Sequence, residues 1–212
     1  MDLGLDFETA GLDHRRRPPL ALGLAYFKDL EVITKEFLFT KAYKTILKKG
    51  MFDAKAIEIN KIDISPISHP EEISYNSLDE VYNAYDFKIM KYLQSLNSSR
   101  LIPVGFNVGQ FDMRYMWHYF PQSATILHYQ VHELNMQIDD LGKLGFINVK
   151  NEAKSYAANK IGVKANWHDA VYDATAAIHI KVYLDDKFIN VKKKLMELEE
   201  ALEASAATKS VE

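Results

Sequence analysis

The stretch Leu3–Leu12, LGLDFETAGL, decides the fold of this 212-residue chain and points to its chemistry. Its apolar residues alternate with Gly4, Asp6 and Glu8, and this period of two predicts a β-strand that ends at a turn. The side chains of Asp6 and Glu8 therefore leave the same face of the strand, about 7 Å apart along it. A lone pair of this kind is most often a solvent-exposed strand face. Here it closes a strongly apolar first strand directly before a turn, where α/β proteins often carry ligand groups.

The composition is that of one folded domain without thiolate chemistry. Hydrophobic residues make up 48% and charged residues 26% of the chain, and its length is enough to bury one core. No Cys is present, so a metal must be held by carboxylates, imidazoles, carbonyls or water, which favours magnesium or manganese. The net charge of -3 argues against a broad basic face for nucleic acid, although acids that bind metal can account for part of it.

The start of the chain does not resemble a targeting segment. MDLGLDFET carries acids where a signal peptide has a basic region. No run in the sequence approaches the roughly 18 apolar residues of a membrane span. We therefore expect a cytoplasmic protein that does not contact a membrane.

Beyond the first strand, the hydrophobic pattern predicts an α/β fold, a mixed sheet flanked by helices. Strands at 20–27 and 31–40 are expected to form an antiparallel meander with the first strand. Strands and helices then alternate, which indicates parallel strands. The later segments are a helix at 78–95 behind a capping box of Ser77 and Glu80, a strand at 101–106, a helix at 108–120, a strand at 126–131, a helix at 151–161 and a long helix from 169. Segment 41–76 is mixed, and we expect a long surface loop at 60–74.

The last part of the chain is expected to be an appendage of the main domain. Apolar residues recur at four-three spacing from 184 to 202, with KKK and ELEE between them. This repeat is shorter than the roughly three to four heptads that identify a coiled coil, so we expect an amphipathic helix folded back on its own domain. A homodimer formed through this helix is the alternative. The chain is therefore divided into a domain at 1–190 and a helix with a frayed tail at 191–212.

Two further acids are expected to point into the protein. Asp112 lies in the predicted helix at 108–120, and apolar residues three, four and seven positions later share its face. Asp173 has the same relation to the apolar stripe of the long helix. Together with the two acids of the first strand they would repel one another in a dry core unless cations neutralise them. Two divalent cations held by shared carboxylates would also serve an in-line displacement at phosphorus.

His168 is a candidate general base. It precedes Asp173 by five residues, which is about 140° around an ideal helix, so both can serve one site only if His168 lies just before the helix begins. An imidazole on such a loop titrates near neutral pH and suits a base that takes a proton from metal-bound water. The alternative is that Trp167 and His168 form an aromatic loop that packs on the core.

Three blocks of the sequence together resemble the DnaQ-like DEDDh exonucleases. LDFETAGL (5–12), GFNVGQFD (105–112) and HDAVYDA (168–174) are similar to the three motifs of that family, in the same order, and the resemblance spans roughly residues 3 to 184. It implies a ribonuclease H-like mixed sheet and two magnesium or manganese ions. It also implies hydrolysis of phosphodiester bonds from the 3′ end of a single strand, with release of nucleoside 5′-monophosphates. We favour DNA slightly over RNA as the substrate.

Carried over by position, the resemblance assigns roles to residues of each block. The metal-binding acids of the family match Asp6, Glu8, Asp112 and Asp173, and its general base matches His168. The segment that contacts the terminal sugar and wedges against its base matches Thr9, Gly11 and Leu12, and residues that line the second motif match Asn107 and Phe111. The sequence departs from the family at Ala10, where Thr is common.

Several alternatives stay open at this point. The basic segment His14–Pro19, HRRRPP, either holds backbone phosphates or coats a loop. The protein could be an RNA-trimming exoribonuclease of the same family, or a module that holds a strand end without cutting it. A metal phosphatase or phosphotransferase is a third class, but the sequence has no P-loop. A polymerase or replication partner is left open.

Overall fold

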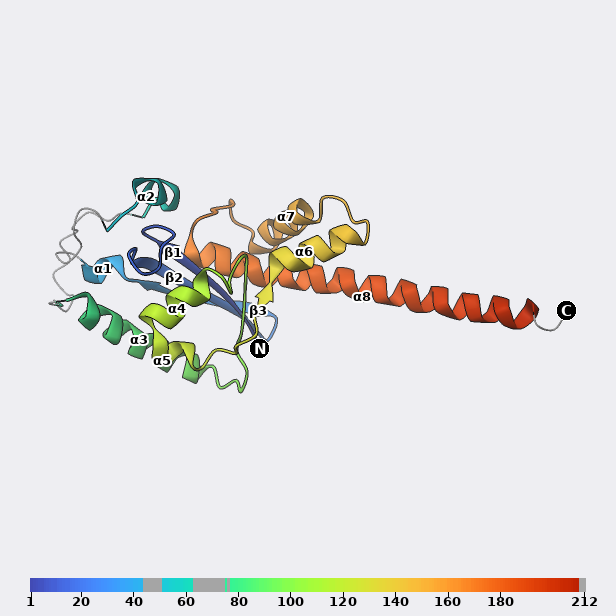
Figure 1. Ribbon diagram of the computed structural model, residues 1–212, viewed down its shortest axis with the longest axis horizontal. Helices are drawn as coiled ribbons and strands as arrows, with labels where there is room; N and C mark the ends of the chain where they lie inside the picture. The colour runs from blue at the N-terminus through green and yellow to red at the C-terminus, as the bar shows by residue number, and fades with distance from the viewer. Residues whose placement is uncertain (44–50, 63–74, 76, 210–212) are drawn as a thin grey trace.

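The computed structural model describes residues 1–43, 51–62, 75 and 77–209. Of the loop expected at 60–74, residues 63–74 lie outside this part. Figure 1 shows a body of sheet and helices from which one long helix projects. The elements in chain order are β1 (Asp2–Thr9), β2 (Pro19–Lys28), β3 (Glu31–Leu38), α1 (Thr40–Tyr43), α2 (Ala54–Asn60), α3 (Leu78–Ser95), β4 (Ile102–Gly105), α4 (Asp112–Tyr119), α5 (Pro121–Ala124), β5 (His132–Glu133), α6 (Leu134–Lys143), α7 (Val149–Ile161) and α8 (Ala170–Lys209).

The sheet has the strand order β3-β2-β1-β4-β5. β1 pairs antiparallel with β2, and β2 with β3, whereas the β1–β4 and β4–β5 pairs are parallel. The β2–β3 hairpin turns at Asp29 and Leu30, which both have positive φ, as a two-residue type I′ turn requires. The expected mixed sheet, an antiparallel meander extended by parallel strands and flanked by helices, is confirmed.

One face of the sheet builds the larger core. Leu3, Leu5 and Phe7 alternate along β1 and are buried among apolar residues of α3, α4 and α5. Helix α3 begins as the sequence predicts, because the Ser77 hydroxyl oxygen accepts the N–H of Glu80 at 3.2 Å. The odd-numbered residues of β1 thus anchor the strand, and the even-numbered ones are left for the other face.

The other face of the sheet is covered by the first turns of α8. A side chain at Gly4 would collide with the backbone carbonyl of Ala174, and one at Gly23 with that of Ala170. Glycine at these two strand positions therefore allows the helix backbone to lie directly on the sheet. The two acids of β1 alternate onto this same face and meet the N-terminal end of α8.

The structure corrects two of the expected segments. The helix expected at 108–120 begins only at Asp112, because the chain first makes a tight turn in which Asn107 has positive φ and its carbonyl accepts the N–H of Phe111. The strand expected at 126–131 is wrong: Leu127 makes only an isolated bridge, and the strand lies at His132–Glu133. A local hydrogen bond from the N–H of Gln130 to the His128 ring competes with strand pairing there.

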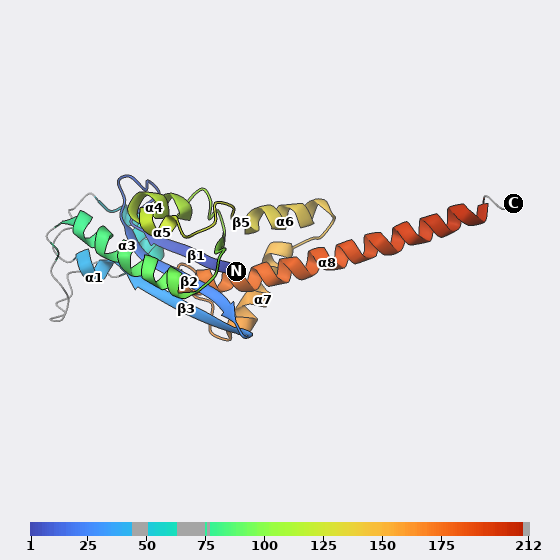
Figure 2. The same cartoon turned by 90° about the horizontal axis from the view of Figure 1, so that it is seen from below.

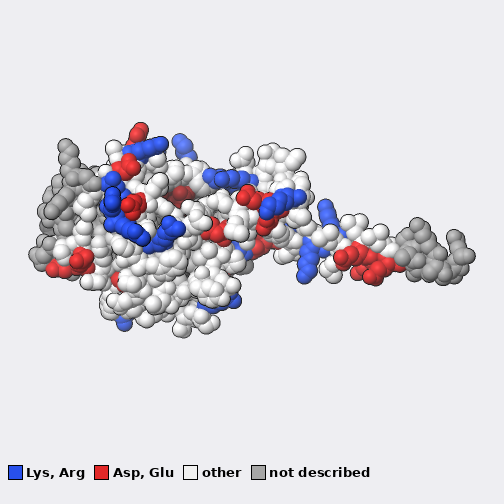
Figure 3. All heavy atoms as spheres, in the orientation of Figure 1, with Lys and Arg blue, Asp and Glu red and all other residues white. Residues whose placement is uncertain are grey.

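The expectation that the C-terminal helix folds back on the domain is also wrong. Helix α8 runs from Ala170 to Lys209 without interruption, and no Gly or Pro lies in that range to end it. Every residue from Lys192 to Glu203 is exposed. Figures 1 and 2 show this part extending away from the body, and Figure 3 shows charged side chains along it. No described helix has the length and apolar character that a membrane span needs.

Candidate active site

The first two acids of the site are fixed by β1. Phe7, between them, is buried in the core, so Asp6 and Glu8 point toward α8 on the opposite face. Glu8 is only 6% exposed and Asp6 is partly buried. The strand register therefore holds two carboxylates at the end of a central strand, with little water around them.

Asp112 joins this pair from the first position of α4. Its Oδ1 atom accepts the N–H of Phe7 at 2.8 Å, so it contacts the β1 backbone at the residue between the two strand acids. The side chain is 2% exposed. The inward orientation expected from the apolar stripe of this helix is what the structure shows, and the turn at Asn107 places the helix start beside β1.

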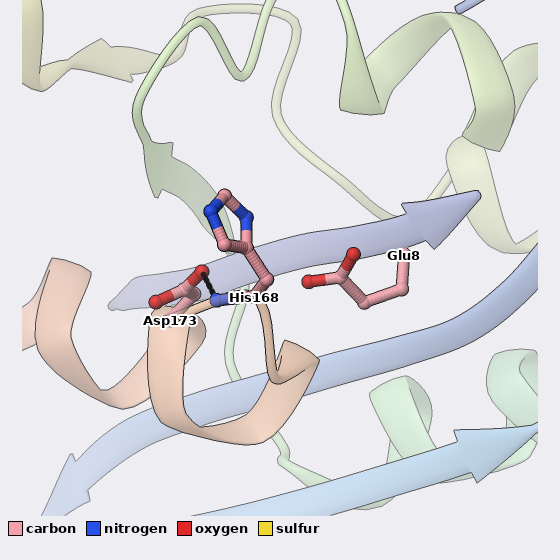
Figure 4. A group of neighbouring side chains, drawn as sticks. All are labelled: Glu8, His168 and Asp173. Carbon is pink, nitrogen blue, oxygen red and sulfur yellow. Dashed lines mark hydrogen bonds between the residues drawn. The ribbon is translucent and has the colours of Figure 1, made fainter. Parts of the chain in front are cut away.

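His168 and Asp173 complete the cluster at the start of α8. His168 lies two residues before the helix in a left-handed conformation, φ 71°, and its N–H donates to Asp173 Oδ2 at 3.0 Å. Asp169 caps the helix, because its Oδ1 accepts the N–H of Tyr172. His168 therefore lies just before the helix begins, where it must lie if it and Asp173 serve one site. Figure 4 shows the imidazole above Asp173, with the Glu8 carboxylate reaching toward it from β1.

Burial and mutual repulsion raise the pKa values of these carboxyl groups. Burial raises the pKa of Asp6 well above its ordinary value, and the charges of Asp112, Asp173 and Glu8 raise it further. Burial, together with Asp173 and Asp169, raises the pKa of Glu8 to about 8. Burial also raises the pKa of Asp112, against the opposing effect of the Phe7 N–H.

The cluster has the donor set of a divalent-cation site. One ligand atom from each of Glu8, His168 and Asp173 lies within 4.8 Å of the others. Burial raises the pKa of Asp173, and its Oδ1 atom is buried with no hydrogen-bond partner in the described ranges. Carboxylate oxygens that are desolvated and unpaired fit hard cations such as magnesium or manganese. These residues can therefore hold a metal ion.

A cavity of about 330 Å³ opens beside the acids, toward α7. Asp6, His168 and Asp173 lie on its acidic side, and Lys150 and Lys154 of α7 contribute positive charge. Its other lining side chains include Phe106, Asn135 and Trp167. A smaller cavity of about 200 Å³ is also bordered by His168, together with Glu8, Asn60 and Asp169. His168 thus lines two cavities that both include carboxylates of the cluster.

Lys154 was not predicted from the sequence. Its Nζ atom lies 4.3 Å from the centre of the Trp167 ring. Its charge partly opposes burial, which raises the pKa of Asp173. Trp167 also packs edge-on against Tyr172. Lys154 and Tyr172 therefore both contact Trp167, the residue next to His168 in the turn before α8. Asp169 was missed as well, although it directly follows His168 in HDAVYDA.

The residues expected to contact the terminal sugar lie at the end of β1. The Thr9 hydroxyl donates to the carbonyl of Gly11 at 2.8 Å, and the buried Tyr115 hydroxyl donates to the same oxygen at 2.6 Å. The two hydrogen bonds fix the backbone of this turn. Leu12, next along it, is 84% exposed.

The remaining expected contacts are more scattered. The Phe111 ring lies 5.2 Å from that of Tyr115, which places it next to the turn after β1. Asn107 is exposed and its visible role is the positive-φ turn before α4. In the basic segment His14–Pro19, Arg15 and Arg16 are exposed, whereas the two prolines are buried. Arg16 lies 3.6 Å from Asp13 in a surface ion pair.

Comparison with known proteins identifies the fold. No family model and no curated protein matches the sequence. Among solved structures, E. coli exonuclease I with zinc and single-stranded DNA matches at 20% identity and a TM-score of 0.56, over 93% of this chain and 44% of that one. The same enzyme with a dA16 oligonucleotide matches at 17% identity and 0.56, over 93% and 45%. A product-bound structure of exonuclease I matches at 17% identity and 0.55, over 93% and 48%.

This chain spans less than half the length of the structures that it matches. At such identities the likeness concerns the fold, and it confirms the ribonuclease H-like fold that the three sequence blocks imply. The chain therefore has the fold of exonuclease I, with an acidic cluster at the end of its central strand.

Proposed function

We propose that this protein is a metal-dependent 3′-to-5′ exonuclease, a hydrolase of phosphodiester bonds. It would remove nucleoside 5′-monophosphates from the 3′ end of single-stranded nucleic acid. One observation carries the proposal: Glu8, Asp112, Asp173 and His168 converge around Asp6 on the fold of exonuclease I. Four carboxylates that are desolvated together are costly to keep without a bound cation.

Asp6, Glu8, Asp112 and Asp173 would hold two magnesium or manganese ions, which stabilise charge on the attacking and departing oxygens of the phosphodiester. His168 would take a proton from the attacking water. His168 is exposed and lines two cavities, and its backbone N–H donates to Asp173, so the imidazole can reach solvent from a fixed position.

The strand end would be held by the turn after β1 and by α4. Thr9, Gly11 and Leu12 would contact the terminal nucleotide, with the exposed Leu12 against its base. Asn107 and Phe111 would contact it from the second motif. Lys150 and Lys154 on the cavity wall give a positive surface for backbone phosphates next to the acids.

DNA is the substrate that we favour, because the solved structures with this fold include complexes with single-stranded DNA. An exoribonuclease is the second candidate, and a module that binds strand ends without cutting is the third. The complete set of acids supports an enzyme over such a module. We keep as predictions the cytoplasmic location and the division into an exonuclease domain at 1–190 and an appendage at 191–212. A polymerase partner is not part of the proposal.

The deciding experiment compares DNA and RNA oligonucleotides of the same sequence, labelled at the 5′ end. Cleavage should require magnesium or manganese, shorten the strand from its free 3′-hydroxyl and release mononucleotides. Asp112→Asn protein purified in parallel controls for contaminating nucleases. Full activity in excess chelator, or cutting of circular single strands, would contradict the proposal. Metal-independent binding without cleavage would favour the binding module.

A further inference from the structure

An uncovered apolar stripe runs along the projecting part of α8. Leu195, Leu198 and Leu202 are 53%, 60% and 69% exposed. Single exposed leucines are ordinary on protein surfaces, but a row of them along a helix segment whose residues from 192 to 203 are all exposed marks an interaction surface. We call residues 191–202 the free segment of α8.

The stripe is the continuation of one that the protein already buries. Leu184 is fully buried, and Phe188 packs against the same core, which includes residues of α6 and α7. From there Val191, Leu195 and Leu198 follow at the same three-four spacing. The body of the protein covers the stripe as far as Phe188, and every residue from Lys192 to Glu203 is exposed. Figure 2 shows the end of α8 extending beyond the body.

Charges along the free segment are arranged in two blocks of opposite sign. Lys192, Lys193 and Lys194 come first, and Glu197, Glu199 and Glu200 follow. Figure 3 shows the basic block nearer the body and the acidic block beyond it. A second copy that runs in the opposite direction would place its acidic block beside this basic block and its basic block beside this acidic block. A parallel copy would place the two basic blocks side by side and the two acidic blocks side by side. We propose that two copies of this chain pair antiparallel through the free segment of α8.

The heptad positions give the register of this pairing. Leu195 would face Leu198 of the second copy, and Val191 would face Leu202, so four layers of apolar side chains are formed. Lys192 then lies opposite Glu199 of the second copy, and symmetry repeats this attraction. A parallel pair would bring Lys194 near Glu199 of the second copy, but it would also bring Lys192 near Lys187, which lies 3.6 Å from Glu152 of its own body.

The pairing goes beyond the proposed nuclease activity and does not depend on it. Val191 lies 18 residues after Asp173 on the same helix, roughly 27 Å away. Fewer than three heptads take part, so the dimer should be weak, with a dissociation constant on the order of 10 μM. Each active site stays open in either state, and cleavage should not change with pairing.

The test is sedimentation equilibrium of the full chain from about 1 to 500 μM, with charge-reversal variants. The parent should pass from monomer to dimer. Lys192→Glu and Glu199→Lys should each weaken pairing by roughly tenfold or more, and the double variant should restore it. Lys194→Glu is the matched control, because its position faces Ala201 of the second copy and should matter little.

A cross-link identifies the direction of the pair, since the chain has no cysteine of its own. Oxidising a mixture of Leu195→Cys and Leu198→Cys proteins should give mainly the mixed disulfide dimer, as the antiparallel register requires. Dominant Leu195→Cys self-dimers, or greater damage from Lys194→Glu than from Lys192→Glu, would show a parallel pair and overturn the proposal. A parent that stays monomeric at all these concentrations would overturn it too.

Discussion

Asp86 and Asp112 are both almost fully buried, but Asp86 is surrounded by hydrogen-bond donors and Asp112 by other acids. Asp86 is 1% exposed and accepts the backbone N–H groups of Gln122 and Ser123 as well as the Ser123 hydroxyl. Asp112 is 2% exposed, accepts the N–H of Phe7 and lies among other acids. A buried carboxylate whose oxygens accept hydrogen bonds from another element stabilises the packing of the two elements, here α3 and α5. A buried carboxylate that faces like charges is stabilised when a cation binds.

The largest expected effect separates these two aspartates by function. Asp112→Asn should lower turnover by roughly 10³-fold or more, because it removes a ligand charge from the site. Asp86→Asn should leave turnover per folded molecule within a few-fold of the parent. It should instead lower the free energy of unfolding by about 1.5–3 kcal/mol, since an amide cannot accept all three bonds. Single-turnover cleavage and urea unfolding measure the two quantities. Loss of cleavage in Asp86→Asn with normal stability would erase the distinction.

The next effect concerns the base. His168→Ala should lower turnover by roughly 10²–10⁴-fold and leave oligonucleotide affinity nearly unchanged, because the ring is exposed and contributes little packing. Stopped-assay kinetics and fluorescence anisotropy give both values. His128→Ala, a histidine outside the cluster, is the control. Near-normal turnover of His168→Ala would favour the packing role.

The comparison of Asp86 with Asp112 also shows which features of a site can be predicted from sequence. The periodicity that predicts an inward Asp112 applies equally to Asp86, which lies three and seven residues before the buried Ile89 and Leu93 of its helix. Periodicity identifies which face of a helix is buried. It does not tell whether hydrogen-bond donors from another element meet the carboxylate there, because Gln122 and Ser123 reach Asp86 only through the packing of α5 on α3.

Other elements show the same boundary between local and distant determinants. The first strand, the capped start of α3 and the placement of His168 before α8 follow from local pattern and were predicted. Helix α6 was missed, although Leu134, Ile138 and Leu141 have helical spacing and are buried. Lys154 approaches the acids only because α7 packs on α8. The free segment of α8 was expected to fold back because spacing reveals an apolar stripe and not what covers it.

A smaller effect should appear in stability without metal. Glu8 has its pKa raised from 4.5 to about 8, and a folded pKa above the unfolded one gives stability that is complete below pH 4.5 and is lost as pH rises to 8. In chelator the parent should therefore lose roughly 4 kcal/mol of unfolding free energy across this window. Glu8→Gln should flatten the dependence and melt higher than the parent at pH 8.

Scanning fluorimetry across pH 4.5–8, with chelator and with magnesium, measures this dependence. Magnesium should stabilise the parent in proportion to the logarithm of its concentration above the dissociation constant, and Glu8→Gln less. If Glu8→Gln melts lower than the parent in chelator and magnesium shifts neither protein, these acids do not share a metal site.

The smallest expected effect belongs to the cation beside the cluster. Lys154 lines the 330 Å³ cavity, and its Nζ atom lies over the Trp167 ring. Its positive charge partly opposes burial, which raises the pKa of Asp173. Asp86, in contrast, is stabilised by N–H donors. Lys154→Met, which keeps the length and apolar stem, should lower kcat/KM for oligonucleotides by about tenfold, mainly through KM, and should weaken the dependence of KM on salt. Lys160→Met is matched to it: Lys160 also lies on α7 over an aromatic ring, that of Tyr156, but it does not line the cavity. Equal losses in the two variants would mean that α7 attracts the strand by general charge. A loss in kcat alone for Lys154→Met would instead make it a positioning residue that acts through Trp167 and His168.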